Sequence, residues 1–248
     1  MSIESEQDLE GLKRSGRVVA LTVQEMARHL KPGITTKELD DIGAAFLRMN
    51  GARSAPILAY NFPGWTCISV NDEAAHGIPG DRVIQAGDLI NIDVSAELDG
   101  YWTDTGSTFA VPPVSPSKQK LMTCTKQALQ SAISVARAGQ SINAIGGAVE
   151  AHARKCGYKV IRNLTGHGVG RTIHEEPRNV LNYYDSKDRR KLREGTVLTI
   201  EPFLSTKAEA VIQMPDGWTL KTPDGSLLAQ YEHTIVITKG TPIIITAA

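Results

Sequence analysis

The chain has 248 residues, enough for a substantial core in one large domain or in two fused halves. Its 27 Lys and Arg residues balance 27 Asp and Glu residues, so the composition indicates neither a nucleic-acid surface nor an anionic-membrane surface. No segment approaches the roughly 18 apolar residues that span a bilayer, and the polar amino terminus lacks the apolar core of a secretory signal.

The first half of the chain is expected to form two helices followed by strands. Apolar residues recur at helical spacing from Leu9 to Leu30, where Pro32-Gly33 ends the pattern. A second helix is predicted from about Thr36 to Asn50. Short β-branched runs predict strands over 67–70, 89–98 and 101–111.

The Asp-Gly pair at 99–100 is a typical two-residue hairpin turn and sets the pairing of the last two strands. In that register Asp93 faces Gly106, and Asp104 faces Ser95. Asp93 and Asp104 then become diagonal neighbours on one face, with Cβ atoms roughly 7–8 Å apart or less, which suits a shared metal ion. The alternative is an exposed polar face of a half-buried sheet.

The second half repeats this order of elements. Ser115-Pro116 is a typical helix start and predicts a helix that runs to Gly139, and a further helix should end at Gly157. Strands are expected over 158–163, 197–204 and 231–238, and the charged stretch 185–194 is expected to be an inserted loop.

Matching sequence anchors in the two halves indicate an internal duplication. The run GDLINID at 87–93 returns as GTVLTIE at 195–201, and each copy ends in a carboxylate. His76-x-x-Pro precedes the first copy, and His174-x-x-Pro precedes the second. We therefore expect one α+β domain over 1–248, built from two pseudo-symmetric halves of roughly 1–112 and 113–248.

The matched carboxylates indicate a shared cation, because a buried charge requires a metal, a counter-ion or a proton. Glu232 corresponds in the second half to Asp104, and His167 lies between glycines that allow close approach of a ligand. Four carboxylates and one imidazole suit ions from Mn(II) to Zn(II). Four acids exceed the charge of one dication, so two ions about 3.5–4 Å apart, with a bound hydroxide that hydrolyses peptides or phosphoesters, are expected.

The remaining histidines and the cysteines divide into candidates and structural residues. His76 and His174 are candidate site residues because turns flank both and their positions match between the halves. His29, His152 and His233 are expected to be hydrogen-bonded surface or core residues. The three cysteines are odd in number and lack C-x-x-C spacing, so neither a disulfide framework nor a zinc finger is expected, and a reducing cytosol fits best.

Five motifs together resemble those of the type I methionine aminopeptidases across about residues 11–246. They are GHGVGR (166–171), HEEP (174–177), the Asp-x10-Asp pair (93–104), TIEP (199–202) and YEHT (231–234). The resemblance implies the pita-bread fold, in which two pseudo-symmetric αβ halves enclose a dinuclear metal site. It also implies a set of metal ligands: Asp93, Asp104, His167, Glu201 and Glu232.

The implied reaction is removal of the initiator methionine from nascent polypeptides with a small second residue, by attack of a metal-bridging hydroxide. The resemblance implies that Glu201 moves the proton, that His174 polarises the scissile carbonyl and that His76 binds near the scissile nitrogen. Four residues resemble the lining of the methionine pocket, although ordinary core packing is the alternative: Cys67, Phe62, Ile173 and Trp218. Ile173 departs from the aromatic residue often found there.

Partners and rival functions follow from the same resemblance. We expect a cytoplasmic monomer that acts on nascent amino termini, with the ribosome as a candidate partner, without nucleic-acid specificity and without a membrane. The metal, Mn, Fe, Co or Zn, is not distinguished by this ligand set. One alternative is a peptidase of the Xaa-Pro type, which usually carries an extra amino-terminal domain. A non-enzymatic pita-bread binding protein is the other, and it would be expected to lack metal ligands.

Overall fold

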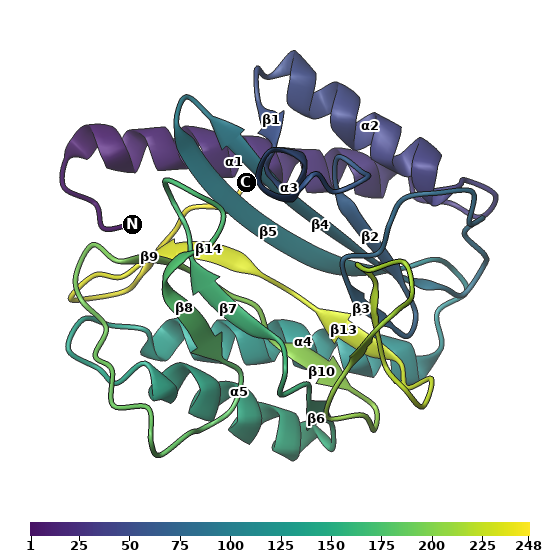
Figure 1. Ribbon diagram of the computed structural model, residues 1–248. Helices are drawn as coiled ribbons and strands as arrows, with labels where there is room; N and C mark the ends of the chain where they lie inside the picture. The colour runs from purple at the N-terminus through teal and green to yellow at the C-terminus, as the bar shows by residue number, and fades with distance from the viewer.

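Two pairs of helices form the outer layers of the protein, and β-sheets lie between them (Figure 1). The computed structural model describes residues 1–248. The helices are α1 (Glu6–His29), α2 (Thr36–Met49), α3 (Ala55–Tyr60), α4 (Pro116–Val135) and α5 (Asn143–Cys156). None of them combines the length with the apolar composition that is required to cross a membrane.

The strands are distributed over both halves of the chain. Those of the first half are β1 (Arg53–Ser54), β2 (Cys67–Val70), β3 (Glu73–Ala75), β4 (Leu89–Leu98) and β5 (Tyr101–Ala110). Those of the second half are β6 (Lys159–Val160), β7 (Thr165–Gly168), β8 (Glu175–Leu181), β9 (Val197–Ile200), β10 (Phe203–Ser205), β11 (Ile212–Gln213), β12 (Leu220–Lys221), β13 (Leu228–Gln230), β14 (His233–Val236) and β15 (Ile243–Ile244).

The sheet pairing relates the two halves. One sheet has the order β1-β4-β2 with β5 on β4, and its counterpart in the second half has the order β15-β14-β9-β7-β8. The order β13-β10-β6 forms a third sheet, and β3 of the first half pairs with the β11-β12 hairpin in the fourth. In Figure 1, α1 and α2 lie on the outside of the first half, while α4 and α5 lie on the outside of the second.

Local sequence signals explain where the helices begin. The Ser5 hydroxyl accepts a hydrogen bond from the Asp8 amide at 3.1 Å, and Thr35 and Glu38 form a reciprocal capping box at α2. The predicted helix from Pro116 to Gly139 is too long, since α4 ends at Val135. The amide of Gly139 donates to the Leu192 carbonyl instead of continuing the helix, so tertiary pairing takes over beyond the end of α4.

The register of the β4-β5 hairpin confirms the prediction. Asp93 pairs with Gly106, and Ser95 pairs with Asp104. The alternative of an exposed polar face is wrong, because Asn91, Ser95 and Asp104 are all buried. The second half covers this face, with the Thr108 hydroxyl donating to the Gln230 carbonyl at 2.8 Å.

The predicted single strand over 197–204 is two strands. β9 pairs with β14 and β7, whereas β10 pairs with β13 and β6. Pro202 has no amide hydrogen to donate to a sheet, so the chain changes sheets at Glu201-Pro202. The break leaves Glu201 outside both strands. The predicted strand over 158–163 is also shorter and is limited to β6.

Each half buries an apolar core of its own. One cluster of 15 buried residues extends from Val19 to Val111. The other has 21 residues, all from Leu121 to Ile237 except Leu89. Helices α1 and α2 enclose the first core, and α4 and α5 enclose the second. Two smaller apolar clusters, of 8 and 7 residues, combine residues of both halves.

The cysteine pairing differs from the sequence expectation. Cys124 of α4 and Cys156 of α5 form a disulfide, and only Cys67 is free. The expectation of no disulfide was wrong because the two residues, 32 positions apart in the sequence, meet only when the helices pack. Their Cα atoms lie 6.5 Å apart, within the range that a disulfide bridges.

Candidate active site

A cavity of about 410 Å³ between the two halves contains every residue that the sequence identified as a site candidate. Carboxylates and histidines line one part of it, and aromatic and aliphatic side chains line another. The candidates on its wall are Phe62, Cys67, His76, Asp93, Asp104, His167, Ile173, His174, Glu201, Trp218 and Glu232.

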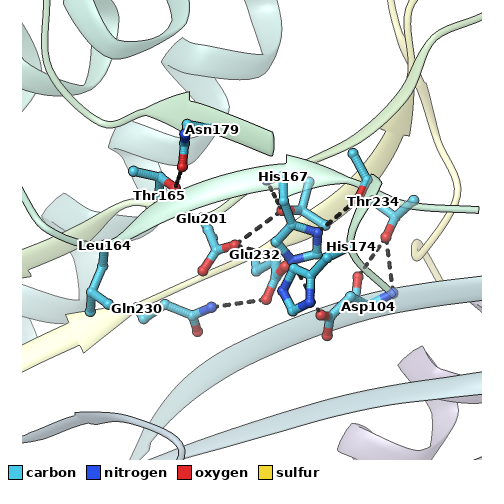
Figure 2. A network of polar contacts seen from close by, with 12 residues as sticks. Asp104, Leu164, Thr165, His167, His174, Asn179, Glu201, Gln230, Glu232 and Thr234 are labelled. Carbon is cyan, nitrogen blue, oxygen red and sulfur yellow. Dashed lines mark hydrogen bonds and ion pairs between the residues drawn. The ribbon is translucent and has the colours of Figure 1, made fainter. Parts of the chain in front are cut away.

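The β4-β5 hairpin presents the two aspartates of the first half. Asp93 lies on β4 and Asp104 on β5, in the diagonal relation that the register requires. The Asp104 backbone is tied to the second half, since its amide donates to the Thr234 hydroxyl at 3.0 Å. That hydroxyl donates in turn to the Asp104 carbonyl at 2.7 Å. Strands β5 and β14 are thereby held together at the site (Figure 2).

The second half contributes His167 from β7, Glu201 from the turn after β9, and Glu232 from the link between β13 and β14. The His167 Nε2 atom lies 3.7 Å from Asp104 Oδ2 and 3.6 Å from Glu201 Oε1. Figure 2 shows these side chains converging from different strands. Thr199 connects two of them, because its hydroxyl accepts from the His167 amide at 3.1 Å and donates to Glu201 at 3.0 Å.

A backbone carbonyl fixes the tautomer of His167. Its Nδ1 lies 3.0 Å from the Gly168 carbonyl oxygen, which can only accept, so Nδ1 carries the hydrogen. The lone pair is then on Nε2, which faces the acids. Burial, with the neighbouring His174 next in importance, lowers the pKa of His167 to about 3, so the ring is neutral at physiological pH.

Burial and mutual repulsion favour protonation of the acids when no cation is present. Burial raises the pKa of Asp93 to about 6. The pKa values of Asp104, Glu201 and Glu232 are raised well above their usual range by burial first and by the charges of the other acids second. Such a cluster binds divalent cations readily, because a cation removes both costs.

The unpaired atoms of the cluster fit a metal centre. Asp104 Oδ1 and Glu232 Oε1 are buried without a hydrogen-bond partner. One donor atom each from Asp104, His167 and Glu232 lies within 4.8 Å of the others. Buried polar atoms are normally hydrogen-bonded, so these unpaired oxygens are suited to a cation. The donor set, oxygen with one imidazole nitrogen, fits the ions from Mn(II) to Zn(II).

The raised pKa of Asp93 predicts how the metal-free protein responds to pH. The pKa of Asp93 is about 6 in the folded protein and about 3.8 in the unfolded chain. Its contribution to folding stability is therefore fully present below about pH 3.8 and is lost as the pH rises through about 6. Asp93→Asn should therefore stabilise the chelated protein at about pH 7.5 by up to about 3 kcal/mol, and by less at about pH 5. Urea unfolding in the presence of a chelator measures the difference.

The exposed hairpin-turn variant Asp99→Asn is the matched control and should show no such gain. Equal stability of parent and Asp93→Asn at both pH values would contradict the expectation that ionised Asp93 destabilises the metal-free protein. With the metal restored, the order should reverse, because the substituted amide carries no charge to neutralise a cation.

His76 and His174 lie at the mouth of the cavity, one from each half. His76 follows β3 with a left-handed φ of 55°, a conformation that side chains adopt rarely and that recurs at functional sites. The ring centroid of His174 is 4.1 Å from that of His167. Burial and the nearby His76 lower the pKa of His174, which favours the neutral ring.

Tyr60, at the end of α3, orients His174. Its hydroxyl lies 2.5 Å from His174 Nδ1. When that hydroxyl donates to Nδ1, the neutral ring carries its hydrogen on Nε2 and can donate from there. In that case His167 and His174 are arranged oppositely, one with a free Nε2 lone pair and the other with an Nε2 hydrogen.

The four residues that resemble a methionine pocket belong to the apolar lining of the cavity. Phe62 and Trp218 pack edge to face with ring centroids 5.2 Å apart. Cys67 is paired across the sheet with Asp93, which puts the thiol between the apolar wall and the acids. Burial, followed by the charge of Asp93, raises the pKa of Cys67 well above its usual range, so it remains a neutral thiol.

Three supporting residues were missed in the sequence: Tyr60, Thr199 and Gln230. The Gln230 side chain donates to Glu232 at 3.0 Å and accepts from Asn91 at 2.7 Å, which fixes one ligand across the two halves. Thr199 and Gln230 both stand two positions before an acid, so the period of a strand could have indicated them. No local signal marks Tyr60, which is 114 residues from its partner.

The chain is similar to known proteins over its whole length. The model of metallopeptidase family M24 matches residues 10–239. Methionine aminopeptidase 2 of Bacillus subtilis is 52% identical over 247 residues, which cover 99% of each chain.

Solved structures are similar in the same way. The crystal structure of methionine aminopeptidase from Rickettsia prowazekii superposes with a TM-score of 0.95 at 38% identity and covers 100% of both chains. A prolidase from Pyrococcus furiosus has a TM-score of 0.78 at 23% identity, and only 65% of that chain is covered. The second likeness shows a common fold alone.

Proposed function

This chain belongs to metallopeptidase family M24, and we propose that it removes the amino-terminal methionine from polypeptides, with the cluster between its halves as the metal centre. The observation that carries the proposal is the convergence of four acids and His167 beside an apolar pocket. The fold is the pita-bread fold of the family, and the activity is that of a metal-dependent aminopeptidase hydrolase.

The rival functions have less support. The Pyrococcus furiosus prolidase shares only 23% sequence identity with this chain, and that likeness shows the fold alone. The relative of 52% identity is a methionine aminopeptidase matched over 99% of both chains. A binding protein without metal would be expected to lack ligands, and here all five ligand positions hold a carboxylate or an imidazole.

The proposed ligands for two divalent ions are Asp93, Asp104, His167, Glu201 and Glu232. When bound, such ions polarise a carbonyl oxygen and lower the pKa of water towards neutrality. The Mn, Fe, Co and Zn ions all suit this donor set, and their number and identity are part of the proposal. The protein contributes the neutral His167 ring and the network of Thr199 and Gln230 that holds the carboxylates.

Glu201 is the proposed proton carrier. It lies at the wall of the cavity outside any strand. A carboxylate in that position could accept a proton from the attacking water and deliver it to the leaving amine. The Thr199 hydroxyl donates to one carboxylate oxygen at 3.0 Å, which leaves the other free for the transfer.

His174 and His76 are the proposed contacts to the scissile peptide. The Nε2 hydrogen that Tyr60 secures on His174 can donate to the carbonyl oxygen as negative charge develops there. His76 would bind near the scissile nitrogen from the opposite half. Both rings stand at the mouth, so the second residue of the substrate must pass between them.

The methionine side chain is proposed to enter the pocket of Cys67, Phe62, Ile173 and Trp218. A thioether gains from contact with aromatic edges and a soft thiol. The acids line the same cavity, so the free amino group of the substrate would lie at the metal centre, with only one residue before the scissile bond. This arrangement explains an exopeptidase.

Substrate choice tests the proposal. Peptides that begin Met-Gly, Met-Ala or Met-Ser should be cleaved, whereas Met-Lys and Met-Phe peptides should be nearly inert, because a large second side chain meets His76 and His174. A Leu start loses the sulfur contact and the shape match, and should reduce kcat/KM about 10–200-fold. The measurement is kcat/KM on Met-Ala-Ser, Met-Lys-Ser and Leu-Ala-Ser after metal removal and readdition.

Comparable kcat/KM values on Met-Ala-Ser and Met-Lys-Ser would refute the proposal that His76 and His174 exclude a large second side chain. Cleavage of an Xaa-Pro bond in preference to Met-Ala would move the chain towards the prolidases. Pro-Ala-Ser is the control peptide, and it should not be hydrolysed.

Several finer expectations belong to the same proposal. We place the enzyme in the cytoplasm, as a monomer acting on nascent chains at the ribosome, since newly made polypeptides carry the initiator methionine. The 248 residues are proposed to form one catalytic domain, with halves of 1–112 and 113–248. Ribosome co-sedimentation and the solution mass of the protein test these points.

A further inference from the structure

A second group of potential metal ligands lies between α4 and α5, away from the catalytic cavity. Cys124 comes from α4, while His152 and Cys156 come from α5. Positions 152 and 156 are four apart, so their side chains lie on one face of the helix, and Cys124 faces them from the neighbouring helix. None of the three lines the cavity that holds the acids.

The histidine of this group has an unmet hydrogen bond. The Nε2 atom of His152 is buried and has no partner, contrary to the expectation that this residue is hydrogen-bonded. A buried polar atom without a partner requires an explanation, and an ion is one of the few available. One donor atom each from Cys124, His152 and Cys156 lies within 4.8 Å of the others.

We propose that Cys124, His152 and Cys156, when the cysteines are reduced, bind one zinc-class divalent cation at a site independent of the catalytic centre. Two thiolates and one imidazole are the donors that zinc prefers, and a water molecule would complete a tetrahedron. With Zn–S bonds of about 2.3 Å, two tetrahedral sulfur ligands stand about 3.8 Å apart. After reduction, the two sulfur atoms would therefore need to move apart only from S–S bonding distance to about 3.8 Å.

The disulfide and the metal site are alternative states of the same cysteines. A dithiol reductant supplies two electrons and two protons to the Cys124–Cys156 bond and is itself oxidised to a disulfide. The cation then displaces the two thiol protons as it binds the thiolates. Either state links α4 to α5 over the larger core, so the outer layer of the second half remains cross-linked in both oxidising and reducing conditions.

Cobalt(II) is the probe that separates this site from the catalytic one. Thiolate ligands produce a charge-transfer absorption in the near ultraviolet, and the catalytic donors are carboxylates and an imidazole. Titration of the reduced protein should develop this absorption to an amplitude of one thiolate-bound cobalt ion per chain, in addition to the cobalt that the catalytic centre holds. The same protein oxidised to the disulfide should lack it, which makes the parent its own control.

Three variants define the ligands. Cys124→Ser and Cys156→Ser should each abolish the absorption, and His152→Ala should weaken cobalt binding at this site more than about 100-fold, beyond the loss of an orienting group alone. Cys67→Ser removes the remaining thiol and should retain the full absorption. Absence of the band from the reduced parent, or its persistence in Cys124→Ser, would overturn the proposal.

A second measurement does not depend on the variants folding. Zinc added to the reduced parent should slow alkylation of Cys124 and Cys156 at least about 10-fold, mapped by mass spectrometry of the peptides. Equal alkylation rates with and without zinc would also overturn the site. Peptidase activity measured in parallel should not depend on whether the cysteines hold zinc or a disulfide.

Discussion

Alanine in place of Glu201 or Asp104 is expected to abolish peptidase activity while the protein remains folded. Each change removes an acid from a cluster in which burial and repulsion already raise the pKa of every carboxyl. The metal-free fold therefore loses little, whereas the metal centre loses a ligand. We expect activity to fall by more than about 10²-fold, the upper end of the effect of losing a residue that merely orients a ligand.

The measurements are kcat/KM on Met-Ala-Ser, bound metal by elemental analysis and the urea midpoint. Glu194→Ala is the matched control, because Glu194 is an exposed acid that pairs with Lys239 at 3.3 Å. It should retain full activity and metal. Activity of Glu201→Ala or Asp104→Ala within threefold of the parent would remove these residues from the centre.

Alanine in place of His174 is expected to lower the rate about 10²–10³-fold with the metal content unchanged, the usual effect of losing one oxyanion donor. The reason is that the two histidines are expected to carry their ring hydrogens on different nitrogen atoms. Gly168 holds the Nδ1 hydrogen of His167 and leaves a lone pair for a metal, whereas Tyr60 occupies Nδ1 of His174 and leaves a hydrogen for the substrate. The loss should fall mainly on kcat, because the charge develops in the transition state.

Tyr60→Phe is the companion variant. It keeps the imidazole but removes the hydroxyl that selects its tautomer, so it should lower kcat by about 10-fold or less, the effect of one ordinary hydrogen bond. Loss of metal from His174→Ala would show that the roles of the two histidines are exchanged. A larger effect for Tyr60→Phe than for His174→Ala would show that Tyr60 itself contacts the substrate.

Much of this molecule could be predicted from short stretches of sequence. The caps of α1 and α2, the Asp-Gly turn and the register of β4 with β5 depend on residues that are near one another in the chain. The same register placed Asp93 and Asp104 side by side. Spacing and order of the motifs then identified the candidate residues, all of which lie on one cavity.

Tertiary packing determined several features that the sequence alone did not predict. The end of α4 at Val135, the change of sheet at Pro202 and the burial of the polar face of β4 all result from contacts between segments far apart in the chain. A local pattern records which side chains share a face, but not what covers that face.

The sequence by itself therefore determined the long helices, the β4-β5 hairpin, the internal repeat and the candidate acids and imidazoles, because these depend on residue type and short-range spacing. Only the tertiary structure decided how the side chains are oriented. It set the tautomer of His167 through Gly168, placed the Tyr60 hydroxyl against Nδ1 of His174, and brought Cys124 to Cys156 and His152. Hydrogen bonds and ligand distances require positions within fractions of an ångström, and such positions exist only after the two halves and their helices have packed.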